Sequence, residues 1–225
     1  MRDSHLDQQH KSSSHEHAAV EPSEIDWDER YGGDQLWSGA PNGSLVAEMS
    51  GVASPGRALD VGCGEGADAV WLSQQGWDVT ALDVSRVALD RAAAAAEEAG
   101  VTVEWLHSGL LEAALEPGSF DLVTAHYPVL RRTPEEDAIR MLMDLVAPGG
   151  TLLFVHHADI DKVQAAEHGF DPEDYVQPRD VAAHLGSDWR VVVNERRSRH
   201  VERGGGAHHD ADLVLRAVKA LAEPS

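Results

Sequence analysis

One stretch, Arg57 to Ser85, constrains the fold of this chain more than any other: RALDVGCGEGADAVWLSQQGWDVTALDVS. Its first five residues form an apolar run that ends at a glycine, which indicates a buried strand. Three glycines within five residues follow, as happens where the backbone needs a positive φ or where a ligand approaches it closely. They are Gly62, Gly64 and Gly66. A helical pattern begins at Ala67, and a second apolar run, Val79 to Leu82, ends at Asp83. This order of strand, glycine turn, helix and strand predicts an α/β fold.

Asp83 indicates the kind of ligand that such a turn would hold. It lies about 20 positions after the first glycine, at the tip of the second predicted strand, where a carboxylate can bind a pair of ribose hydroxyls. The run from Gly62 to Ala67 also satisfies G-x-G-x-x-A, the turn typical of nicotinamide and flavin dinucleotide sites. From the turn alone, the ligand is either such a dinucleotide or S-adenosylmethionine, which carries an adenosine ribose but no pyrophosphate.

Three segments resemble motifs of class I S-adenosylmethionine-dependent methyltransferases. LDVGCGEGADAVWL resembles motif I of that family, in which an acidic residue stands two before the first glycine, as Asp60 does here. FDLVTAHYPVL, Phe120 to Leu130, resembles motif IV, and VAPGGTLLF, Val146 to Phe154, resembles the entry to strand 5. The motifs follow the family's order and usual spacing, and the resemblance covers Trp27 to Val218. It therefore favours S-adenosylmethionine over a dinucleotide.

The resemblance implies a Rossmann-like, doubly wound α/β fold with three layers, αβα. Its seven-stranded, mostly parallel sheet would have the strand order 3-2-1-4-5-7-6, with strand 7 antiparallel. We expect a single domain over residues 23–225, after a disordered tail rich in histidine and serine over residues 1–22. Within the domain, residues 23–50 would form a lid and N-terminal helices, and residues 57–157 the S-adenosylmethionine-binding half. Residues 158–177 would form an insertion that selects the substrate.

The resemblance also implies a role for each part of the cofactor site. The backbone of the glycine turn would carry the methionine part near a helix N-terminus, and Asp60 would orient its ammonium group. Asp83 would accept hydrogen bonds from the ribose, and Val84 and Leu110 would sandwich the adenine. The expected cofactor-binding residues are Trp27, Tyr31, Asp60, Gly62, Cys63, Gly64, Gly66, Asp83, Val84, Ser108, Gly109, Leu110 and His126.

One position departs from the family's pattern. The residue just after strand 3 that binds the adenine amino group is often an aspartate in the family, but Gly109 occupies that place here. The departure implies that backbone groups, apolar contacts around Leu110 and the hydroxyl of Ser108 hold the adenine.

His126 and Tyr127 are the candidate catalytic residues. The predicted strand Phe120 to Ala125 delivers both to the carboxyl edge of the sheet, where ligands bind in open α/β folds. His126 would act as a general base or position the methyl acceptor. The alternative is that backbone groups or water meet the hydrogen bonds of His126 and that it has no catalytic role. The same two interpretations, catalytic and structural, apply to Tyr127.

Several histidines raise the question of a metal site. Alternation along a strand sends His156 and His157 to opposite faces, so the two cannot chelate one ion from a regular strand. We therefore expect no metal, and expect one of this pair to line the acceptor pocket. The other candidate ligands near them are Asp159, His208, His209 and Asp210.

Caps and turn residues predict the boundaries of the other elements. Ser44 would cap a helix to Ser50, and Ser85 a helix through Ala99 that Gly100 ends. A helix from Pro134 to Leu145 would begin at its proline. Val101 to Leu106 and Thr151 to His157 would be strands 3 and 5.

Composition limits the partners. The formal net charge of −21 disfavours nucleic acid, and no apolar run approaches the length of a membrane span. A single cysteine excludes an internal disulfide and suggests a cytoplasmic location. We expect a monomer or homodimer.

The expected function is methyl transfer from S-adenosylmethionine to a small-molecule acceptor. The lid sequence WDERY and the compact C-terminal half look like the enzymes of the tellurite-resistance and thiopurine type. Two alternatives stay open: an NAD(P)-dependent oxidoreductase and a non-catalytic protein that binds S-adenosylmethionine.

Overall fold

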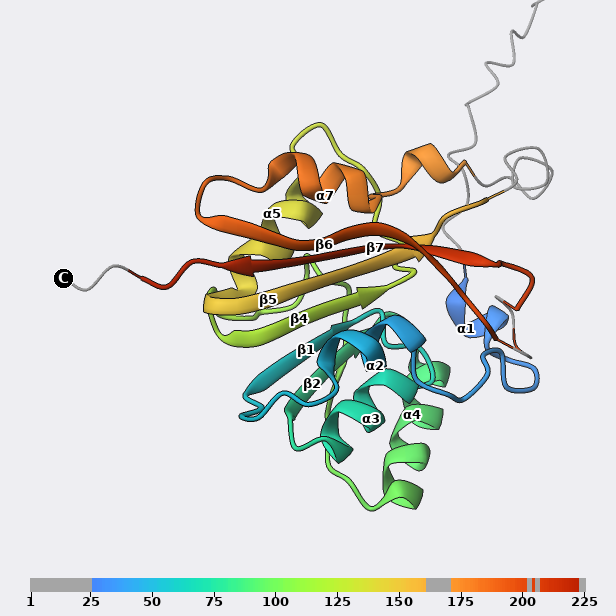
Figure 1. Ribbon diagram of the computed structural model, residues 1–225. Coiled ribbons are helices and arrows are strands. Elements are labelled where there is room, and N and C mark those ends of the chain that lie inside the picture. Colours follow the sequence, from blue (N-terminus) through green and yellow to red (C-terminus); the bar gives the residue numbers. More distant parts are fainter. Residues whose placement is uncertain (1–25, 161–170, 202–203, 205–206, 223–225) are drawn as a thin grey trace, which may run out of the picture.

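The computed structural model describes residues 26–160, 171–201, 204 and 207–222. Seven strands form one sheet in the order β3-β2-β1-β4-β5-β7-β6 (Figure 1). Strands β1 to β5 pair in parallel, and β7 runs antiparallel to both β5 and β6. The predicted order and the antiparallel strand 7 are therefore confirmed. The strands are β1 (Arg57–Val61), β2 (Asp78–Asp83), β3 (Glu104–His107), β4 (Phe120–His126), β5 (Val146–His157), β6 (Trp189–Ser198) and β7 (Ala211–Lys219).

Helices cover both faces of this sheet. Figure 1 shows α2, α3 and α4 on one side and α5 and α7 on the other. The helices are α1 (Trp27–Arg30), α2 (Gly43–Met49), α3 (Ala67–Gln74), α4 (Arg86–Ala99), α5 (Asp137–Leu145) and α7 (Pro178–His184), with a 3-10 turn η1 (Pro172–Asp174) before α7. None of the helices in the described ranges is long and apolar enough to cross a membrane.

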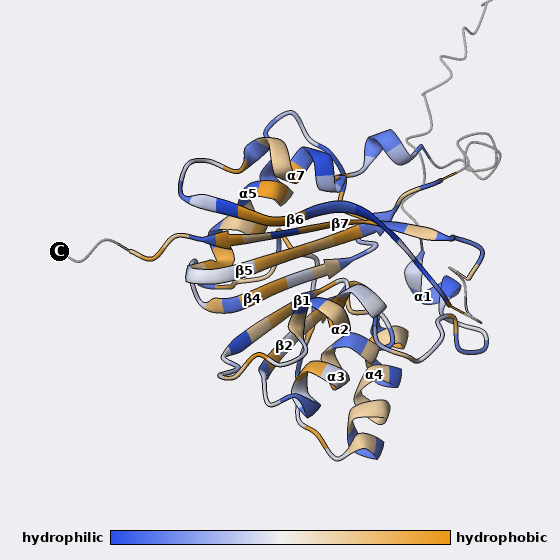
Figure 2. Cartoon of the chain, in the orientation of Figure 1, coloured by the Kyte–Doolittle hydropathy of each residue, from blue (hydrophilic) through white to orange (hydrophobic). Residues whose placement is uncertain are grey.

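Two apolar clusters explain why the sheet lies between two helical layers. Successive strand residues point to opposite faces, so Leu122 and Leu153 belong to one cluster and their neighbours Val123 and Leu152 to the other. The first cluster includes side chains of α2 and α3, and the second includes side chains of α5 and α7. Figure 2 shows the central strands as mostly apolar and the helices as a mixture of apolar and polar residues, whereas most residues of the edge strand β6 are exposed.

Parallel pairing puts the carboxyl ends of three strands at one edge of the sheet. β1, β2 and β4 end at Val61, Asp83 and His126, and α1 lies beyond that edge (Figure 1). Ser85 caps α4 by accepting from the N–H of Ala88, and Gly100 ends the helix with a φ of 68°, as predicted.

Several predicted boundaries are wrong, each for a local reason. Asn42, not Ser44, caps α2, because its side chain accepts from the N–H of Ser44. Helix α5 begins at Asp137 rather than Pro134, because Glu136 has a left-handed φ of 57° that breaks the helical path. β3 begins at Glu104 rather than at Val101, because pairing with β2 starts only at Glu104.

β5 is longer than predicted, whereas the predicted tail and half of the predicted insertion lie outside the described residues. Val146 already pairs with Phe120, so β5 begins five residues before Thr151, and the ladder shifts register between Phe120 and Leu122. The predicted tail over residues 1–22 lies outside the described residues, as do residues 161–170, which are half of the predicted insertion over residues 158–177.

Candidate active site

A cavity of about 920 Å³ opens at the carboxyl edge of the sheet. Every residue that the sequence singled out for cofactor binding or catalysis lines it, although those residues come from distant parts of the chain. They are Trp27, Tyr31, Asp60, Gly62, Cys63, Gly64, Gly66, Asp83, Val84, Ser108, Gly109, Leu110, His126 and Tyr127. The roles assigned to them stay predictions, but the structure brings them together around one space.

The turn between β1 and α3 can be built only with glycine at two of its positions. Gly66 caps α3 with a φ of 81°, and a Cβ atom there would lie 2.6 Å from the Cβ of Ala92. Gly64 has a φ of 52°, and a Cβ atom there would lie 2.9 Å from the hydroxyl of Tyr31. The turn therefore packs closely against both α4 and the N-terminal segment.

Asp83 ties the glycine turn to the end of β2. One carboxylate oxygen accepts from the N–H of Gly64 at 2.8 Å, and the other accepts from the N–H of Ser85 at 2.9 Å. Burial raises the pKa of the Asp83 carboxyl, and these backbone hydrogen bonds oppose the rise. Each oxygen keeps a second lone pair, so the carboxylate can still accept from a hydroxyl in the cavity.

Asp60, at the end of β1, holds an acceptor that lacks a partner. It is 2% exposed, and its Oδ2 atom is buried without a hydrogen bond within the described part of the chain. Burial raises the pKa of the Asp60 carboxyl well above its usual range, and the nearby Asp68 and Asp83 add to the rise. A buried carboxyl oxygen without a partner can accept a hydrogen bond from an ammonium group or another donor that enters the cavity.

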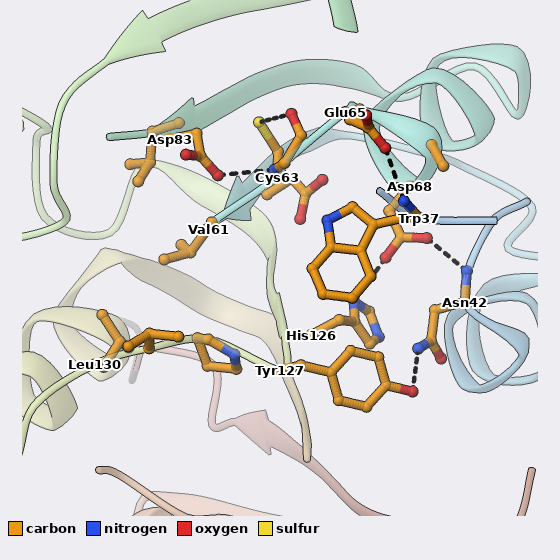
Figure 3. A pocket seen from close by; sticks show the side chains of 18 of the residues that line it. Trp37, Asn42, Val61, Cys63, Glu65, Asp68, Asp83, His126, Tyr127 and Leu130 are labelled. Carbon is orange, nitrogen blue, oxygen red and sulfur yellow. Dashed lines mark hydrogen bonds and ion pairs between the residues drawn. The ribbon is translucent and has the colours of Figure 1, made fainter. Parts of the chain in front are cut away.

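His126 is held by an acidic residue of α3 (Figure 3). Its Nδ1 atom lies 2.9 Å from Oδ2 of Asp68 and 3.2 Å from the hydroxyl of Thr124. Asp68 in turn accepts from the N–H of Asn42 at 2.6 Å. Nδ1 bonded to a carboxylate carries the proton, which leaves Nε2 as the basic nitrogen. Nε2 is buried and has no partner in the described ranges.

Asp60, Asp68 and His126 each offer one possible ligand atom, and these three atoms all lie within 4.8 Å of one another. Two carboxylates and an imidazole at that separation suit a bound ammonium group, and they could also hold a divalent cation. The expectation that the chain uses no metal therefore stays a prediction.

Tyr127 is fixed on three sides. Its hydroxyl donates to Asp212 at 3.0 Å and accepts from the side chains of Asn42 at 2.8 Å and Arg199 at 3.0 Å. Burial and then the charge of Asp212 raise the pKa of Tyr127 above its usual value. A phenol with a raised pKa and a fully occupied oxygen is a poor base, so this geometry favours a positioning role.

The C-terminal histidines stack behind Tyr127. The ring of His157 lies 4.0 Å from that of Tyr127 and 3.8 Å from that of His209, nearly parallel to both. His156 is buried, and its Nδ1 accepts from the N–H of His157. Neither His156 nor His157 lines the cavity, so the expectation that one of them faces the acceptor is wrong. The stack instead packs the far side of Tyr127.

The N-terminal segment closes one side of the cavity. Glu65, in the glycine turn, accepts from the N–H groups of Leu36 and Trp37 at 3.1 and 3.0 Å. The indole of Trp37 donates to the hydroxyl of Tyr31 at 2.8 Å, and both rings line the cavity with Trp27. The N-terminal segment therefore forms part of the cavity wall, and its role as a lid stays a prediction.

Sequence reasoning missed several residues that shape this cavity. Asn42 and Asp212 act on Tyr127 from 85 residues away in either direction. Asp68 has a weak signal, as an acidic residue in the first turn of α3. The other missed residues that the contacts above involve are Trp37, Glu65 and Arg199.

Residues 58–150 match the family model described as a methyltransferase domain. The ubiquinone biosynthesis O-methyltransferase of Escherichia coli O157:H7 is 34% identical over 113 residues, which cover 49% of this chain and 47% of that protein. The enzyme of the same name from Ralstonia nicotianae is 39% identical over 100 residues, which cover 44% of this chain and 42% of that one. The chain thus matches about half the length of these relatives. Neither is of the tellurite-resistance or thiopurine type, so that finer placement stays a prediction.

Solved structures share the fold over most of the chain. A structure titled for the conversion of a disulfide bond into a thioacetal group during echinomycin biosynthesis has a TM-score of 0.70 at 20% identity, covering 88% of this chain and 92% of its own. A magnesium protoporphyrin IX methyltransferase from Synechocystis PCC 6803, with S-adenosylhomocysteine bound, has a TM-score of 0.57 at 20% identity, covering 79% and 80%. Residues 58–150 thus match a methyltransferase domain, and the solved structures show that the fold of these proteins extends over most of the chain.

Proposed function

We propose that the chain transfers a methyl group from S-adenosylmethionine to a small-molecule acceptor. The observation that carries the proposal is the unpartnered carboxylate oxygen of Asp60, buried beside the glycine turn in the same cavity as Asp83. S-adenosylmethionine bears an ammonium group, a carboxylate and a ribose, and the cavity offers a matching partner for each. A dinucleotide would instead bring a pyrophosphate, which the buried acidic residues of the cavity would repel.

The chain's own residues take the following roles in this proposal. Asp60, with the carboxylate of Asp68 nearby, binds the ammonium group, and the N-terminus of α3 lies beside the place of the methionine carboxylate. Asp83 binds the ribose. S-adenosylmethionine supplies the electrophilic methyl group. The protein contributes mainly position, since a near-attack geometry is worth roughly 7–11 kcal/mol.

His126 is the residue that could remove a proton from the acceptor. The carboxylate of Asp68 fixes its tautomer, so that Nε2 is the basic atom. Tyr127, held by Asn42, Asp212 and Arg199, would position the acceptor. A general base adds about 10² to 10⁴ in rate, and only where the nucleophile must lose a proton.

The acceptor is proposed to be small, because the cavity of about 920 Å³ has the size of a pocket for one cofactor and a small molecule. We infer a cytoplasmic enzyme, because its one cysteine, Cys63, is a free thiol. We also propose that it acts as a monomer or homodimer. The net charge of −21 argues against nucleic acid as the substrate.

Calorimetry with the purified chain tests the cofactor. We expect S-adenosylmethionine and S-adenosylhomocysteine to bind with micromolar affinity and NAD(P) not to bind. Asp83→Ala should lose both ligands, and Asp90→Ala, at an exposed position of α4, should keep them. Binding of NAD(P) alone would overturn the proposal. An acceptor screen with His126→Ala would follow, because binding without turnover on any acceptor would favour a non-catalytic protein.

A further inference from the structure

An apolar slot with exposed walls lies beyond Asp83 in the cavity. Val84 and Leu111 are 50% and 49% exposed, and both line the cavity next to the buried Leu110. Val84 follows β2, and the two leucines follow β3, its neighbour in the sheet. Apolar side chains that line one part of a cavity wall suit a flat, uncharged ring.

The carboxylate of Glu112 lies next to Gly109, close to these apolar side chains. The N–H of Ala113 donates to the carbonyl of Gly109 at 3.1 Å, which makes residues 109–113 one helical turn. In such a turn, a side chain three positions on leans back over the first residue. Glu112 does so, and a Cβ atom on Gly109 would lie 2.3 Å from its Oε2 and 3.7 Å from Cγ1 of Val84.

Gly109 therefore leaves room for the carboxylate of Glu112 beside the apolar slot. Glu112 is exposed and lines the cavity, so its oxygens are accessible to a ligand in the slot. A carboxylate only accepts hydrogen bonds, which means that the ring in the slot must present an N–H donor at its edge. Adenine presents such a donor, its exocyclic amino group.

We propose that Glu112 is the specificity residue for the base, accepting a hydrogen bond from the amino group of adenine between Val84 and Leu111. The assignment rests on the proposed function, because it places the adenosine of S-adenosylmethionine in the cavity. It adds a charged side chain to the backbone groups, the apolar contacts around Leu110 and the Ser108 hydroxyl that we expect to hold the adenine. It also gives Gly109 a reason: any side chain at position 109 would displace the Glu112 carboxylate.

The test compares two ligands whose bases differ along one edge. S-adenosylhomocysteine carries the 6-amino group and an unprotonated N1, and S-inosylhomocysteine carries a carbonyl oxygen at position 6 and a proton on N1. The wild-type chain should bind the adenine compound roughly tenfold to a hundredfold more tightly, because a hydrogen bond to a charged group is lost in the other. Glu112→Gln should reduce this ratio to near one, since an amide can accept from the amino group or donate to the carbonyl.

A second variant separates recognition from structure. The double variant Gly109→Asp/Glu112→Ala moves the carboxylate from residue 112 to residue 109. A Cβ atom at residue 109 would lie 2.3 Å from the place that Oε2 of Glu112 now occupies. The double variant should restore the preference that Glu112→Ala alone loses. Glu116→Gln, an exposed acid outside the cavity lining, is the matched control and should bind both ligands like the wild type.

The outcomes distinguish this assignment from the function on which it rests. If S-adenosylhomocysteine binds and Glu112→Gln keeps the wild-type ratio, the role of Glu112 is wrong and the proposed function stands. If the double variant binds like Glu112→Ala alone, the carboxylate does not act at this place, and the assignment is overturned. If the wild-type chain does not bind S-adenosylhomocysteine, the proposed function and the assignment fall together.

Discussion

At neutral pH the carboxyl of Asp60 works against the folding of the free chain. Its folded pKa is raised by burial and by Asp68 and Asp83, so any stabilisation by its protonated form is lost as the pH rises through the folded pKa. Above that pH the folded chain bears the cost of a buried charge that the unfolded chain exposes to water. A ligand that brings a positive charge to Oδ2 would offset this cost.

Asp60→Asn should therefore separate stability from binding. We expect the variant to raise the free energy of unfolding of the free chain by about 1 kcal/mol, because it removes a buried charge. We expect it to weaken the binding of S-adenosylhomocysteine at least tenfold. Urea denaturation and calorimetry measure the two effects. Asp90→Asn, exposed on α4, is the control and should change neither. A variant that is both less stable and unchanged in binding would contradict the role given to Asp60.

Single residues also mark the limit of what the sequence could predict about the site. Asp60 and Asp83 are recognisable because their places relative to the glycine turn are local in sequence. Asn42 and Asp68 are not, because their contacts form only when the N-terminal segment folds onto α3 and β4. No spacing rule links residues that meet through tertiary packing.

At the scale of helices and strands, boundaries set by local sequence agree with the prediction, and boundaries set by tertiary contacts differ from it. β1 begins and ends as predicted, because its apolar run is bounded by a charged residue and a glycine. β5 begins earlier than predicted, because Val146 finds a partner in Phe120, which the turn residues Pro148 to Gly150 do not reveal. Helix α5 begins later than Pro134, because the backbone at Glu136 is left-handed.

The N-terminal segment, residues 26–42, is attached to the rest of the molecule by polar contacts at a few points. Asp28 accepts from the hydroxyl of Ser85 at 2.6 Å and from the N–H of Val87 at 3.1 Å. Glu65 binds two backbone N–H groups of the segment and also Arg91 at 2.7 Å. An element held by a few hydrogen bonds opens locally at a lower free energy than the sheet does.

Glu65→Gln should loosen this segment without unfolding the domain. The amide leaves one backbone N–H facing another donor and removes the charge that Arg91 binds, at a cost of roughly 1–3 kcal/mol. Hydrogen–deuterium exchange of residues 30–40 should rise about tenfold, while exchange in β1 and β4 stays unchanged. Glu97→Gln, on the exposed face of α4, is the control. Equal protection of the segment in both variants would show that Glu65 does not anchor it.

At the scale of the whole molecule, stability should depend on the most buried histidine of the described residues, which lies where β5 pairs with β7. His156 is 5% exposed and pairs with Leu213 in the β5–β7 ladder. Burial lowers its pKa from 6.5 to about 4, and the neighbouring ring of His157 adds to the fall. The unfolded chain therefore binds a proton at this residue near pH 6.5, whereas the folded chain does not until about pH 4.

Stability should accordingly fall as the pH drops through this window, because the unfolded state gains protons first. Between pH 7.5 and pH 5, His156 accounts for a loss of about 2 kcal/mol in the free energy of unfolding. Carboxyls with raised pKa values, such as Asp60, act in the opposite direction, so the wild type must be compared with His156→Gln at both pH values. The variant keeps an acceptor for the N–H of His157 and should lose about 2 kcal/mol less than the wild type. His200→Gln, at an exposed position, should follow the wild type. Equal losses in wild type and His156→Gln would mean that His156 is protonated in the folded state and that the seam admits water.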